Sequence, residues 1–228
     1  MSTSGTYTFN PSLGELTIYA YQLIGVRPTE LLQEHMDVAR TATNMMFTRW
    51  SNQGVNLWQV TQTTIPLVQG VATYPVSSNA VTMLDTIIRT VTDSTTIDRI
   101  ILPISRTEYA SYPNKQQQGF PTVFWFDRLL SPTVTIWPVP DGTQTSLVYY
   151  SVLRIQDANM SGTEQVDIPP IWLEAMAYGL AERLALIWAP DKILALKAVA
   201  DEAYEIAAQQ NVETAQQYIS PQIGGYFR

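Results

Sequence analysis

Residues 169–190 read PPIWLEAMAYGLAERLALIWAP. The paired prolines are typical of a helix start, and Pro190 is typical of a helix end. Between them, apolar residues recur on one helical face, at Ile171, Ala175, Tyr178, Ala181, Ala185 and Trp188. Residues 55–166 lack this helical spacing of apolar residues, so they interrupt the helical part of the sequence. The helix at 169–190 begins after this interruption.

Two more helices are predicted before the interruption. Ser12 can cap a first helix, which Gly25 ends. Thr29 can cap a second helix, which runs to about Gln53 and stops at the glycine that follows.

A last helix is predicted to begin at Asp191 and to fade near residue 212. Its inward side chains are predicted to be Leu194, Ala198, Ala203, Ile206 and Ala207. Helices at both ends of a chain must bury their apolar faces together. We therefore expect a four-helix bundle built from residues 1–54 and 167–213.

The interruption, residues 55–166, is rich in the β-branched and aromatic residues that favour strands. Strands are predicted at 56–64, 81–91, 97–104, 121–127, 133–138 and 145–154, with a short one after Gly70. Asp141-Gly142 predicts a hairpin between the last two strands. Ser105 can cap a short helix, with Glu108 at the capping-box position. The predicted fold class is α+β, with a sandwich-like or barrel-like β domain inserted into the helical bundle.

Composition limits what the chain can do. It has 228 residues, of which 13 are Lys or Arg and 20 are Asp or Glu, giving a net charge of −7. A nucleic-acid binder that neutralises phosphates is therefore disfavoured. Only 14% of residues are charged, so the surface is easy to bury against other chains. The alternative is a weakly charged soluble monomer.

Several kinds of site are absent from the sequence. There is no cysteine, which excludes disulfides, cysteine-bound zinc and thiol catalysis. A single histidine, His35, leaves no His-pair metal site, and we expect it to be packed or at an interface. No G-x-S-x-G, P-loop or G-x-G-x-x-G motif occurs. We expect no metal and no cofactor. Because no apolar run reaches about 18 residues, we also expect no membrane span, and the N-terminus does not read as a secretory signal.

Carboxylates provide the one route to catalysis that the sequence leaves open. Glu108, Asp127, Glu174 and Glu182 could support glycoside hydrolysis. Glu174 and Glu182 lie roughly two helical turns apart and can share a face. Solvated helix carboxylates are common, so we expect a protein that is not an enzyme.

The last residues, 214–228, predict an extended tail. Aromatic and β-branched side chains alternate there with Gln, Gly and Pro. Such a segment cannot fold alone, but it reaches roughly 50 Å when extended and can bind a partner. A frayed terminus is the alternative.

Four motifs together resemble a known family. They are SNQGVNLWQV (51–60), ISRTEYASYPNKQQQGFPTVFWFDR (104–128), VTIWPVPD (134–141) and VDIPPIWLEAMAYGLAERLA (166–185). In this order the chain is similar, over about 10–213, to the head-to-tail adaptor proteins of tailed bacteriophages. The resemblance is to the tail tubular protein A type of short-tailed phages.

The resemblance implies a structural virion protein without catalysis. Such adaptors form a dodecameric ring that binds the portal protein after DNA packaging. The ring carries the tail nozzle or tube, with tail fibres as further candidate partners, and lets double-stranded DNA pass without specific binding. The expected location is the phage neck in the virion, and the host cytoplasm during assembly.

By position in the family, the tail would dock on the portal. The residues concerned are Tyr218, Ile219, Ile223, Tyr226, Phe227 and Arg228. Trp50, Trp58 and Trp125 are candidate interface or core residues, whereas Trp172 is expected in the core. Two other functions stay open, a tail-associated enzyme that degrades the cell wall and a more distal neck or tail-tube component.

Overall fold

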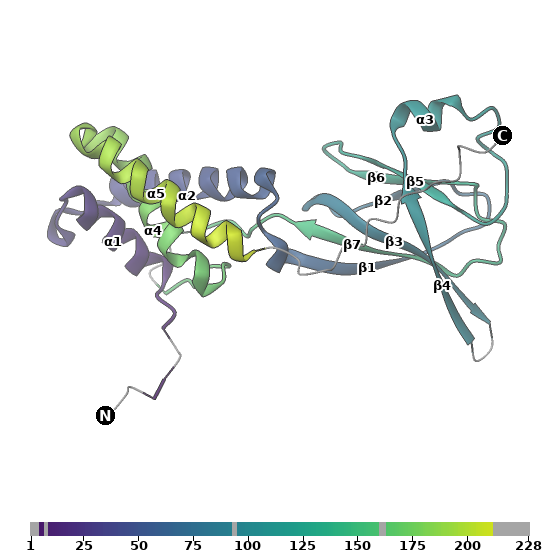
Figure 1. Ribbon diagram of the computed structural model, residues 1–228, viewed down its shortest axis with the longest axis horizontal. Helices are drawn as coiled ribbons and strands as arrows, with labels where there is room; N and C mark the ends of the chain where they lie inside the picture. Colours follow the sequence, from purple (N-terminus) through teal and green to yellow (C-terminus); the bar gives the residue numbers. More distant parts are fainter. Residues whose placement is uncertain (1–4, 7–8, 93–94, 160–162, 212–228) are drawn as a thin grey trace, which may run out of the picture.

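The computed structural model describes residues 5–6, 9–92, 95–159 and 163–211, and it consists of a helical part and a β part (Figure 1). Five helices and seven strands confirm the α+β class. The helical part contains α1 (Leu13–Ile24), α2 (Gln33–Gln53), α4 (Leu173–Trp188) and α5 (Ile193–Gln210). The predicted tail, 214–228, lies outside the described residues, and the division into separate domains stays a prediction.

Helix α4 organises the helical part, because it has close contacts with α1, α2 and α5. Its Leu180, Ala181 and Leu184 side chains are completely buried. Gly179 allows α2 to approach closely, since a Cβ atom there would lie 3.0 Å from Sδ of Met46. Helices α1, α2 and α5 thus surround α4, while a regular four-helix bundle stays a prediction. None of the described helices is long and apolar enough to span a membrane.

Local capping signals set the helix ends. The Ser12 side chain accepts a hydrogen bond from the Glu15 backbone, and Gly25 ends α1 in the left-handed conformation, both as predicted. The predicted start of α2 at Thr29 is wrong. Pro28–Glu30 forms a single 3-10 turn, the chain is extended at Leu32, and α2 begins only at Gln33.

The predicted inward face of α5 is also partly wrong. Leu194 is 84% exposed and Ile206 is 54% exposed, and Ala198 is exposed as well. The buried side chains are Leu196, Ala200, Ala203 and Ala207. Helix α5 carries two apolar stripes at helical spacing, so its sequence alone does not say which stripe meets α4.

The β part is one curled sheet with the strand order β1-β7-β3-β4-β5-β6-β2. Its strands are β1 (Val60–Pro66), β2 (Thr73–Pro75), β3 (Ala80–Thr92), β4 (Thr95–Pro103), β5 (Val123–Asp127), β6 (Thr133–Trp137) and β7 (Ser146–Leu153). The first strand starts later than predicted because Leu57–Gln59 forms a 3-10 turn.

Strand β4 makes the sheet curl by changing partners. It pairs with β3 over Thr95–Ile101 and then with β5 at Leu102 and Pro103, the one parallel pairing in the described sheet. The two halves enclose one core, to which β2, β3, β4, β5, β6 and β7 all contribute side chains. Helix α3 (Arg106–Ser111) follows β4, capped by Ser105 as predicted.

The predicted hairpin at Asp141-Gly142 is wrong, although the turn exists. Asp141 Oδ1 accepts hydrogen bonds from the Thr143 backbone (3.0 Å) and hydroxyl (2.7 Å), and Gly142 has a φ of 97°. However, β6 lies between β5 and β2, whereas β7 lies between β1 and β3. The turn therefore connects the two halves of the curled sheet rather than two paired strands.

Candidate functional site

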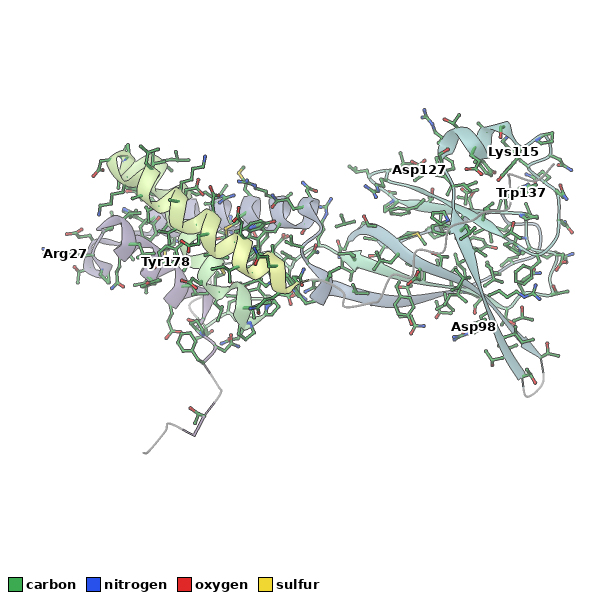
Figure 2. All side chains as sticks on the ribbon, viewed as in Figure 1. Arg27, Asp98, Lys115, Asp127, Trp137 and Tyr178 are labelled. Atoms are coloured by element: carbon green, nitrogen blue, oxygen red, sulfur yellow. The ribbon has the colours of Figure 1, made fainter. Side chains whose placement is uncertain are left out.

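The carboxylates that could support hydrolysis are divided between the two parts of the molecule. Glu108 lies on α3 and Asp127 at the end of β5, both in the β part, whereas Glu174 and Glu182 lie on α4 in the helical part (Figures 1 and 2). Within the described ranges, no group of three or more His, Asp or Glu residues could hold a metal ion.

The single histidine has a structural role. Nδ1 of His35 accepts a hydrogen bond from the Leu32 backbone at 3.1 Å, which satisfies a free donor at the start of α2. Its ring stacks on Trp188 at 5.0 Å and meets Tyr21 edge-on at 5.5 Å. The Tyr21 hydroxyl donates to the His35 carbonyl at 2.6 Å, and burial raises the pKa of Tyr21. The histidine is packed, one of the two alternatives predicted for it.

Three of the tryptophans singled out by the sequence lie together near the junction of the two parts. Trp172 is completely buried, as predicted, and Trp50 lies beside it in the same core, with 5.1 Å between ring centroids. Trp58 is half-buried, packs 5.4 Å from Trp172, and donates its Nε1 hydrogen to the Asp167 carbonyl at 3.1 Å. An interface role for Trp58 stays a prediction.

Residues 105–119, part of the longest family motif, pack against the sheet through aromatic stacking. Tyr109 stacks on Trp125 of β5 at 5.7 Å, and Tyr112 stacks on Trp137 of β6 at 4.2 Å. Lys115 Nζ donates to the Tyr112 carbonyl at 3.1 Å and lies 5.6 Å above the Tyr109 ring. These stacking contacts therefore hold residues 105–119 against the sheet. An interface role for Trp125 stays a prediction.

The exposed large apolar side chains include two groups, besides others such as Leu130, which is 99% exposed. One lies where α4 ends and α5 begins, at Leu186, Ile187 and Leu194. The other follows β4, where Ile100 (69% exposed) and Leu102 (65%) share one face of the strand and Ile97 (53%) lies on the opposite face. Exposed apolar side chains that gather in one place commonly mark contacts with other proteins.

The β3–β4 pair extends past the neighbouring strand β7. Pairing of β3 with β7 ends at Arg89, whereas its pairing with β4 continues to Thr92 (Figure 1). Arg89 and Asp98 face each other across the hairpin with two hydrogen bonds of 2.8 Å, and these form the one ion pair in the described part of the chain. The Arg89 guanidinium lowers the pKa of Asp98, labelled in Figure 2.

Sequence reasoning missed this hairpin as a feature of the surface. The signal available was the run Ile97, Ile100, Ile101 and Leu102 within one predicted strand. Which of these side chains are covered depends on the strands beside β4, and only the structure gives that order.

The described surface thus has exposed apolar side chains on β4 and aromatic stacking between residues 105–119 and the sheet, features that are common where proteins contact one another. Residues 21–223 match the family described as SU10 adaptor protein, so the chain belongs to this family of structural phage adaptors. The match spans both the helical and the β part, and it confirms the resemblance to phage head-to-tail adaptors. No curated protein matches the chain.

Proposed function

We propose that this protein assembles into a dodecameric adaptor ring that binds the phage portal after DNA packaging and carries the tail nozzle or tube. The observation that carries the proposal is the family match over residues 21–223. The proposed location is the neck of the virion, after assembly in the host cytoplasm. An elongated molecule with a helical end and a β end offers separate surfaces for the portal and for tail components (Figure 1).

The C-terminal residues are proposed to dock on the portal. Asn211, the last described residue, donates a side-chain hydrogen bond to the Val55 carbonyl. This bond holds Asn211 beside Val55, at the junction of the two parts. The proposed docking residues are Tyr218, Ile219, Ile223, Tyr226, Phe227 and Arg228.

Charge and exposure support the rest of the proposal. A net charge of −7 in each copy repels the DNA backbone on average, which suits a channel through which DNA slides without binding. Trp58 and Trp125, both partly exposed, are proposed as contacts with neighbouring chains. Trp50 is 4% exposed, so it contributes to the core against which Trp58 packs.

Light scattering of the purified protein, alone and mixed with portal, tests the proposal. We expect a complex that contains the portal and about twelve added copies. Deleting residues 214–228 should leave the circular dichroism spectrum unchanged and weaken portal binding. A full-length chain that leaves the mass of the portal unchanged would refute the adaptor function.

A further inference from the structure

Among the described residues, the longest strand edges without a partner belong to β1 and β4, and shorter ones occur on β2 and at the end of β5. Strand β1 ends the sheet and pairs only with β7, so its other edge is open over Val60–Pro66. Strand β4 pairs with β3 over Thr95–Ile101, but β5 joins it only from Leu102 onward. Its side facing away from β3 is therefore open over Thr95–Ile101. Open edges present backbone N–H and C=O groups that can pair with another strand.

Neither edge has the features that usually prevent pairing. Proteins protect exposed edges with free charges, prolines or bulges. Strand β1 has no charged residue, and its proline, Pro66, stands at the very end. The two charges of β4 are already engaged, because Asp98 pairs with Arg89 and the Arg99 guanidinium lies 5.0 Å above the Phe120 ring.

The strand directions suit pairing between copies. The three pairings β1–β7, β7–β3 and β3–β4 are all antiparallel, so β4 runs opposite to β1. When a second copy is placed beside the first in the same orientation, its β1 lies antiparallel to β4. A contact between two different surfaces of the same chain, repeated from copy to copy, is the kind that closes a ring.

We propose that β4 of one copy pairs with β1 of the next, so that the sheet continues from copy to copy. The inference rests on the proposed ring and names its contact. Thr63 and Ile65 lie on the face of β1 that meets the sheet core, as Ile101 does on β4. Ile97 lies on that same face of β4. When Thr63 lies opposite Ile97, the residues of β4 that pair with β1 fall within its open edge.

This register also places exposed apolar side chains of the two strands opposite each other. It places Val60, 37% exposed, opposite Ile100 on the outer face of the sheet. Because β1 is uncharged, no charge is set against Asp98 or Arg99, and the contact needs no ion pair. Copies with a net charge of −7 repel one another, so association should strengthen as salt screens the repulsion.

The absence of cysteine makes a direct test simple. One batch of protein carries Thr63→Cys and the other carries Ile97→Cys, and the two are mixed with portal and oxidised. Directly opposite residues in an antiparallel ladder have Cα atoms about 4.5–5.5 Å apart, within the range of disulfides. We expect a covalent dimer in the mixture and none in either batch alone.

Two further variants of β4 sharpen the result. Thr96→Cys places the thiol on the opposite face of the same strand, so it should cross-link at least tenfold less with Thr63→Cys. Thr95→Cys places the thiol on the same face of β4 as Ile97→Cys does. It therefore detects a β1–β4 register that is shifted by two residues. Cross-linking of Thr63→Cys with Thr95→Cys or Ile97→Cys, but not with Thr96→Cys, supports the proposal.

Failure of the contact and failure of the function give different results. If the mixture assembles on the portal but no cross-link forms, the proposed contact is wrong and the adaptor function stands. Cross-linking of Ile97→Cys with itself would show a two-fold β4–β4 contact and would also overturn the proposal. If the unsubstituted chain fails to assemble on the portal, the proposed function and the contact fall together.

Discussion

Replacing Leu180 with alanine tests the statement that α4 organises the helical part. The Leu180 side chain is completely buried among residues of α1, α2 and α5. The substitution removes three carbons, a loss of about 2.4 kcal/mol at roughly 0.8 kcal/mol per buried methylene. The cavity left among rigid helices adds to this, so we expect the free energy of unfolding to fall by about 3–4 kcal/mol.

Leu186 provides a matched control on the same helix. Its side chain is 62% exposed, so Leu186→Ala makes the same chemical change with much less burial lost. We expect a loss below about 1 kcal/mol for this variant. Urea unfolding of the isolated proteins, followed by tryptophan fluorescence and circular dichroism, measures both values.

The two variants should also differ in thermal midpoint. At about 2–4 °C per kcal/mol for a chain of this size, Leu180→Ala should unfold about 6–16 °C lower than the unsubstituted protein. Equal losses for the two variants would refute the reasoning, because they would mean that Leu180 is not in a packed core.

The Asp98 carboxylate should titrate below its ordinary range, because the Arg89 guanidinium lowers its pKa in the folded protein. The ion pair therefore stabilises the hairpin above the unfolded pKa of about 3.9, and this contribution is lost as pH falls through the folded pKa. NMR titration should show the Asp98 pKa returning to its ordinary value in Arg89→Gln, and an unchanged pKa would contradict the contact. Ile100→Asp should leave the thermal midpoint within about 2 °C and reduce assembly with portal at least tenfold, measured by light scattering. His35→Ala removes the acceptor for the Leu32 backbone and should lower the free energy of unfolding by about 1–3 kcal/mol in urea. No loss in that variant would mean that the hydrogen bond contributes nothing.

Local signals in the sequence predicted the local structure well. Ser12 and Gly25 act on their own helix, so the limits of α1 follow from neighbouring residues alone. The enrichment in β-branched and aromatic residues placed most of the strands within a few residues. Even so, Thr29 resembled a cap for α2 but lies within a short 3-10 turn.

Contacts between distant residues could not be predicted in the same way. Val60 pairs with Val152, and nothing in either segment specifies the other. Asp141-Gly142 therefore predicted a turn correctly but assigned it to the wrong pair of strands. The open edges of β1 and β4 could not be predicted for the same reason, because an edge is open only where no other strand of the fold pairs with it.

The candidate site, too, could be predicted only in part from the sequence. Family motifs in the sequence predicted an adaptor, and the family match confirms it. The sequence could not show that residues 105–119 are fixed by aromatic stacking against β5 and β6, because Trp125 and Trp137 meet their partners only in the folded chain.

The chain enters and leaves the β part through two strands that lie side by side. Strand β1 follows the N-terminal helices and β7 leads back to the C-terminal helices, with Val60 opposite Val152. Since the two strands that connect the β part to the helices are paired with each other, the β part is attached through one two-stranded connection. A related or designed β part with the same two connecting strands could therefore replace it without any change in the helices.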